Sequence, residues 1–225
     1  MSKRALLVTL AFFLVLIAVL FIPAGTVVWL AGWVFIAILC GFNILIILML
    51  ARNNPQLLEE RMSPPIQRNQ PLWDKVFLPL LQLLVVAWFI LIALDAVRLG
   101  WSEVPVWLQV LGALGLLFSL YIIYLTFREN AYLAPVVKLQ KERGQSVVRT
   151  GLYRHLRHPM YAGTLIFFPA TALLLGSWLG LIVRPLFAVM FVIRTVFEDR
   201  MLKRGLEGYT EYSNTVKYRL IPHVW

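Results

Sequence analysis

Long apolar runs separated by short polar segments make up most of the sequence. An α-helix needs about 20 consecutive apolar residues to cross a bilayer, and within lipid a single segment can satisfy its backbone hydrogen bonds only as a helix. With 60% hydrophobic residues, the chain is also far more apolar than a soluble domain. We therefore predict an all-α integral membrane protein with about six transmembrane helices. These helices are expected near residues 5–22, 27–50, 76–97, 104–127, 159–176 and 178–197.

The first apolar run has a second interpretation as a signal peptide. It is longer than the usual apolar core of such a peptide, and Phe21-Ile22-Pro23-Ala24 is a poor small-residue cleavage site, so we favour a spanning helix.

The chain then divides into two regions. Residues 1–127 hold about four spans and a polar loop at 51–75, where prolines leave room for one short helix near Glu59–Arg61. Residues 128–225 form the second region.

The basic residues predict the orientation in the membrane. The net charge is +10, but the basic residues lie between apolar runs rather than in a separate domain, which argues against a nucleic-acid partner. The loop 51–75, the stretch 128–158 and the tail carry most of them, so the positive-inside rule places these segments and both termini in the cytoplasm. We expect a multi-pass protein, which in a bacterium lies in the inner membrane. On the opposite side, Asp95 is close enough in sequence to pair with Arg98, and neither Asp95 nor Arg184 is assigned a role.

Two charged clusters bracket the last two apolar runs. The first is the polar, basic and aromatic block 151–163, and the second is Arg194-Thr195-Val196-Phe197-Glu198-Asp199, which closes the final run. Only a short turn around Gly176 separates the runs, so they are expected to form an antiparallel helical hairpin. The hairpin brings the two clusters together, and Arg194 and Glu198 share one helix face because they are four residues apart.

Each cluster has a functional and a structural interpretation. The block 151–163 offers aromatic faces, cations and a proline at a helix start, which suit a ligand with an anionic group. It is equally typical of an ordinary basic and aromatic membrane boundary. Arg194 and Glu198 either line a polar cavity or form a surface ion pair. His155 and His158 lack a further ligand, so no metal site is expected.

Three ordered motifs in the C-terminal region carry a resemblance to a known family. They are Val147–Tyr153 leading into Arg157–Gly163, then Arg194-x-x-x-Glu198-Asp199, then Gly208-Tyr209-x-x-Tyr212 with Arg219 and Pro222. In this order and with these gaps, the chain resembles the isoprenylcysteine carboxyl methyltransferase family of the phospholipid methyltransferase superfamily. The resemblance covers roughly residues 128–225. The usual Glu-Glu pair is Glu198-Asp199 here, so it does not settle the role of Asp199.

The resemblance implies a membrane methyltransferase with a cytoplasmic pocket for S-adenosylmethionine and a lipid-embedded methyl acceptor. Arg194 then contacts the acceptor and, with Glu198, forms the catalytic pair. The residues implied to surround the cofactor are Val147, Val148, Tyr153, His158, Pro159, Met160, Tyr161 and Glu198.

The identity of the acceptor stays open at the level of sequence. A carboxylate acceptor, such as an isoprenylcysteine, fits Arg194 because a guanidinium binds carboxylates through two hydrogen bonds. A phospholipid or small-amine N-methyltransferase is the alternative, with Glu198 as the nearest base. A sterol-type membrane reductase that uses NADPH is a further alternative. A transporter is less favoured, because the ionisable residues cluster at one membrane face instead of the midplane.

Overall fold

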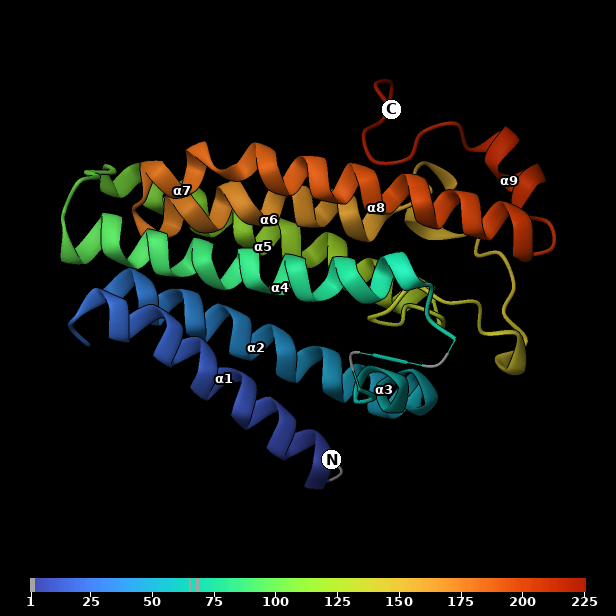
Figure 1. Cartoon of the computed structure of the whole chain (residues 1–225), viewed down its shortest axis with the longest axis horizontal. Helices are drawn as coiled ribbons and strands as arrows, with labels where there is room; N and C mark the ends of the chain where they lie inside the picture. Colours follow the sequence, from blue (N-terminus) through green and yellow to red (C-terminus); the bar gives the residue numbers. More distant parts are fainter. Residues whose placement is uncertain (1–2, 65, 68) are drawn as a thin grey trace.

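The computed structural model describes residues 3–64, 66–67 and 69–225, and all regular structure in these ranges is helical. The helices pack lengthwise into one bundle (Figure 1). Their bounds are α1 Lys3–Ala24, α2 Leu30–Asn53, α3 Pro55–Arg61, α4 Leu72–Ala93, α5 Val106–Glu129, α6 Pro159–Leu175, α7 Trp178–Ile182, α8 Arg184–Gly205 and α9 Tyr209–Thr215. The segment 130–158, α3 and α9 gather at one end of the bundle, which we call the loop-rich end.

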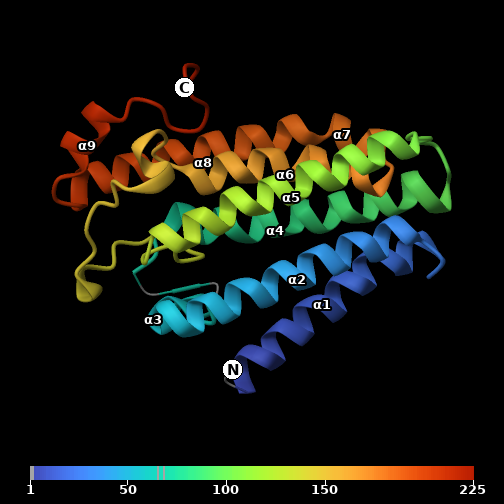
Figure 2. The same ribbon diagram turned by 180° about the vertical axis from the view of Figure 1, so that it is seen from behind.

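Five helical segments are long and apolar enough to cross a membrane, and α6 is a shorter apolar helix of 17 residues. The five segments are residues 6–24, 30–53, 72–98, 106–129 and 178–205. The predicted all-α membrane architecture is therefore confirmed. Seen from behind, α5 lies beside α6, and α1 runs obliquely away from the bundle toward its N-terminal end (Figure 2).

Two predicted helix boundaries are wrong. The third span starts at Leu72, because Pro71 supplies the extended backbone that precedes a helix, and this moves Asp74 from the predicted loop into the first turn of α4. An acidic residue is favourable there because helix N-termini carry partial positive charge. The last span continues past Phe197 to Gly205, so its charged cluster lies inside α8 rather than at its end.

Glycine lets α5 and α6 approach closely. A methyl group at Gly112 of α5 would lie 2.4 Å from the backbone nitrogen of Leu174, and one at Gly163 of α6 would lie 3.0 Å from the side chain of Ile123. Ser119 of α5 donates a hydrogen bond to the carbonyl of Gly163 at 2.8 Å. The long α5 thus fixes α6, which begins at the candidate site described below.

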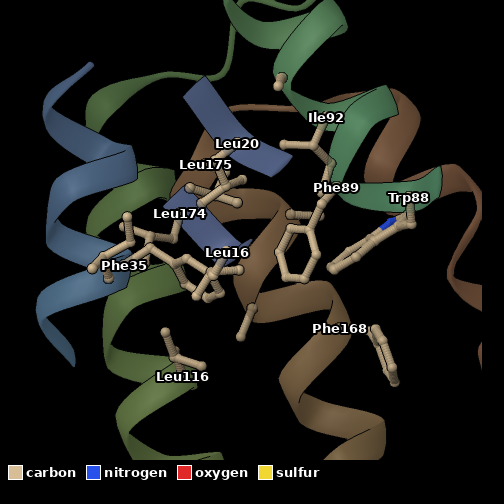
Figure 3. Packing of buried hydrophobic residues seen from close by; sticks show 14 of the residues in the cluster. Leu16, Leu20, Phe35, Trp88, Phe89, Ile92, Leu116, Phe168, Leu174 and Leu175 are labelled. Carbon is tan, nitrogen blue, oxygen red and sulfur yellow. The ribbon is translucent and has the colours of Figure 1, made fainter. Parts of the chain in front are cut away.

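An aromatic cluster joins α4, α6, α7 and α8 in the middle of the bundle. Trp88 is almost fully buried and contacts the ring of Phe168 at 5.3 Å (Figure 3). It also contacts the ring of Phe187 at 5.3 Å and donates its indole N–H to the carbonyl of Gly180 at 2.8 Å. Phe168 and Phe187 stack at 3.9 Å. Aromatic side chains bury a large apolar area, so packing between these rings holds together the helices that carry the site.

The end of the bundle opposite the loop-rich end is fastened by Asp95, which lies in a π-helical turn after α4, η1 (Leu94–Arg98). Asp95 is fully buried and accepts hydrogen bonds from Ser102 at 2.6 Å, Ser177 at 2.5 Å and the backbone N–H of Leu179 at 3.2 Å. Asp95 and Arg98 form no ion pair among the described residues. A buried carboxylate needs close donors, and the loop before α5 and the start of α7 provide them.

Candidate active site

A cavity at the loop-rich end collects the residues that the sequence singled out. It lies between the start of α6, the C-terminal half of α8, α9 and the segment 130–148. The predicted site residues that line it are Val147, Val148, Tyr153, His158, Met160, Tyr161, Arg194 and Glu198. Pro159 does not line the cavity. It is buried as the first residue of α6, where its fixed φ starts the helix.

Arg194 and Glu198 are connected through a tyrosine from the facing helix. The Nε–H of Arg194 donates to the hydroxyl oxygen of Tyr161 at 2.8 Å, and this hydroxyl donates to Oε2 of Glu198 at 2.5 Å. Arg194 is only 4% exposed, so the alternative of a surface ion pair does not describe this contact. The hairpin therefore places both charged groups of α8 against the start of α6, as the short turn predicted.

The guanidinium of Arg194 has further partners on two other segments. Nη2 donates to the carbonyl of Pro135 at 3.2 Å, and Nη1 lies 2.8 Å from Oδ1 of Asp74. This ion pair is not aligned as a hydrogen bond, and among the described residues neither Nη1 nor Oδ1 has a hydrogen-bond partner. All three nitrogens of the Arg194 guanidinium therefore contact other parts of the protein at the cavity wall.

Asp199 is the hub of a second polar network. It accepts hydrogen bonds from Arg157 at 2.9 and 2.8 Å and from the hydroxyl of Tyr209 at 2.8 Å, while Nε of Arg219 lies 3.3 Å away. His158 stands 3.5 Å from the same carboxylate and stacks on the ring of Tyr161. The network ties the start of α6 and the C-terminal tail to α8.

Tyrosine hydroxyls hold the outer wall of the cavity. Asn130, at the C-terminal end of α5, donates to the hydroxyl oxygen of Tyr153 at 2.7 Å, and the hydroxyl of Tyr212 donates to the carbonyl of Tyr153 at 2.7 Å. Burial raises the pKa of Tyr153 and of Tyr212, so both phenols stay neutral at physiological pH. Asn130 was missed by the sequence analysis because its chemistry resembles that of any helix-ending asparagine.

A family model described as phospholipid methyltransferase matches residues 107–207. The matched segment runs from α5 to just past α8 and contains every predicted cofactor and acceptor residue. The match supports a membrane methyltransferase of the superfamily that includes phospholipid and isoprenylcysteine methyltransferases. Members of the matched family generally use S-adenosylmethionine. A comparison with curated proteins found no match.

Proposed function

We propose that the protein transfers a methyl group from S-adenosylmethionine to the carboxylate of an isoprenylcysteine or a similar lipophilic acid. The observation that carries this proposal is Arg194, a buried cation on the cavity wall that Tyr161 connects to Glu198. A carboxylate is the anion that a guanidinium binds best through paired N–H groups. The loop-rich end, in this proposal, faces the cytoplasm.

The lining of the cavity fits S-adenosylmethionine in its chemistry. Tyr153 and Tyr161 offer aromatic faces for a sulfonium cation, and the half-buried Glu198 offers a carboxylate for the amino group of the cofactor. Val147, Val148 and Met160 supply apolar surface beside them. When bound, the cofactor supplies a methyl group activated on sulfur.

Methyl transfer to a carboxylate demands positioning more than proton transfer, because the attacking oxygen is already ionised. Arg194 would orient this oxygen, and the hydrogen bond from Arg194 to Tyr161 fixes the direction of the guanidinium. Tyr161 in turn holds Glu198 in place through its own hydroxyl hydrogen. These three side chains therefore form a preorganised frame around the point of transfer.

A phospholipid or small amine is the second candidate acceptor. The description of the matched family favours it, and Glu198 lines the cavity where a base for an ammonium proton is required. This chemistry differs from the first in one measurable respect, because the product is an N-methyl group that survives treatment with base.

The test uses purified protein in lipid vesicles with radiolabelled S-adenosylmethionine and, in separate reactions, farnesylcysteine or phosphatidylethanolamine. We expect base-labile label in the farnesylcysteine product. Base-stable label in the phospholipid alone would select the second acceptor. Absence of transfer to both, together with a thermal shift from NADPH and none from S-adenosylmethionine, would overturn the methyltransferase proposal and favour a reductase.

A further inference from the structure

Asp74 is a fully buried carboxylate that the assignments above leave without a role. It lies in the first turn of α4, outside the segment 107–207 that the family model matches. Burying a carboxylate is costly unless hydrogen bonds and an opposite charge compensate it. The identity of its partners therefore indicates what the buried charge does.

Both oxygens of Asp74 contact the candidate site. Oδ2 accepts hydrogen bonds from the side chain of Gln70 at 2.8 Å and from the backbone N–H of Val137 at 2.9 Å. Oδ1 lies 2.8 Å from Nη1 of Arg194. Val137 and Arg194 both line the cavity. One side chain of α4 thus joins the cavity wall formed by the segment 130–148 to the candidate acceptor-binding residue on α8.

Asp74 is one of several groups that hold the guanidinium of Arg194. Tyr161 holds Nε and Pro135 holds Nη2, while the ring of Phe77, also on α4, lies 5.4 Å from the guanidinium carbon. Asp74 supplies the only negative charge in ion-pair contact with Arg194 among the described residues. A long cationic side chain loses rotamer freedom when it is held at several atoms, so each contact narrows the range of directions that the guanidinium can take.

We propose that Asp74 is a positioning residue for methyl transfer, which holds Arg194 and the cavity wall at Val137 in the geometry that the acceptor requires. This inference rests on the proposed methyltransferase function. If Asp74 has this role, the N-terminal region contributes a residue to the site in addition to spanning the membrane. Asp74 contacts neither cofactor nor acceptor and acts through Arg194.

The first test is Asp74→Asn, which keeps the side-chain shape and removes the charge. We expect kcat to fall by about 10- to 100-fold, as for a displaced positioning group, while the dissociation constant for S-adenosylmethionine changes by less than threefold. Asp74→Glu keeps the charge and should restore part of the lost kcat. Equal losses in kcat and in cofactor binding, or an unchanged kcat, would overturn the proposal.

Asp95→Asn is the matched control, because Asp95 is an equally buried carboxylate at the opposite end of the same helical segment. It should lower the melting temperature without a selective loss of kcat. Gln70→Ala is the milder variant for the case in which Asp74→Asn does not fold. It removes one donor to Oδ2 and should lower kcat in the same direction by a smaller factor.

The double variant Asp74→Asn/Arg194→Lys tests whether Asp74 affects turnover through Arg194 or independently of it. If Asp74 acts through Arg194, adding Asp74→Asn to Arg194→Lys should lower kcat far less than it does in the wild type. Full additivity would overturn the proposal.

All variants are assayed with whichever acceptor the wild type methylates, farnesylcysteine or phosphatidylethanolamine. Transfer only to the phospholipid would defeat the proposed carboxylate acceptor, yet a selective loss of kcat in Asp74→Asn would still support the positioning role. A wild type that is inactive toward both lipids and shows a thermal shift with NADPH but none with S-adenosylmethionine would overturn both proposals.

Discussion

Nη1 of Arg157 lies 2.9 and 2.8 Å from the two carboxylate oxygens of Asp199, and both side chains are buried. Arg157 precedes α6 by two residues, whereas Asp199 lies in α8. The pair therefore closes the hairpin at the loop-rich end, while the turn at Gly176 closes it at the other end. The cavity depends on this closure because both helices contribute walls to it.

Asp199→Ala should destabilise the protein by about 3–5 kcal/mol, because it leaves the buried cation of Arg157 without its partner. The loss would be measured by thermal or denaturant unfolding in detergent micelles. Glu211→Ala is the control, since this residue is exposed and lies 3.9 Å from the exposed Arg149, a contact that contributes little. Similar melting temperatures for both variants would contradict the role of Asp199 as a hub.

Arg194→Lys should lower turnover by about 100-fold, because lysine lacks the planar fork that orients a carboxylate. The charge opposite Asp74 is kept, so the protein should fold, and the affinity for S-adenosylmethionine should stay within several-fold of the wild type. Steady-state kinetics and calorimetric titration of the cofactor measure the two effects. A variant with wild-type turnover would show that Arg194 does not orient the acceptor.

Glu198→Gln should weaken the binding of S-adenosylmethionine, because it removes the carboxylate that we assign to the amino group of the cofactor. An ionic hydrogen bond is worth about 1.5–3 kcal/mol, which corresponds to roughly a 10- to 150-fold rise in the dissociation constant. Glu207→Gln, an exposed acid beyond the end of α8, should leave cofactor binding unchanged. Equal affinities in wild type and Glu198→Gln would remove Glu198 from the cofactor site.

Tyr161→Phe should lower kcat while leaving the fold intact, because it deletes only the hydroxyl that joins Arg194 to Glu198. Two hydrogen bonds to charged partners are lost, and each has a net worth of about 1.5–3 kcal/mol. Crystallography or vibrational spectroscopy of the carboxylate would report the release of Glu198. A variant that retains both full activity and the wild-type carboxylate signal would show that the connection is dispensable.

Gly112→Ala should destabilise the bundle by about 1–3 kcal/mol, since the added methyl group meets the backbone of α6 and cannot be absorbed by a side-chain movement. The predicted contact is 2.4 Å from the nitrogen of Leu174. Gly41→Ala is the matched control, because a methyl group there meets nothing within 4 Å. Thermal unfolding of both variants measures the difference, and equal stabilities would show that α5 and α6 can separate without cost.

The sequence predicts the spans and the residues of the cavity because both signals are local. Apolar runs define the helices, and the motif residues around His158 and Glu198 lie at the ends of one short hairpin. The sequence does not reveal the position of Asp74, because a polar first turn of a helix resembles the loop before it. The partners of Asp95 are also hidden, since Ser177 comes from a distant part of the chain.

The length of α6 has a kinetic consequence. Its 17 residues rise about 25 Å, less than the hydrocarbon core, whereas the neighbouring α5 has 24 residues. Under the proposed function, we therefore expect the cavity at the start of α6 to lie near the depth of the lipid headgroups rather than in the surrounding water. The lipid-soluble acceptor that we propose would reach the cavity by lateral diffusion, so its mole fraction among the lipids would set the rate. Dilution with inert lipid will slow the reaction even when the bulk concentration of acceptor stays constant.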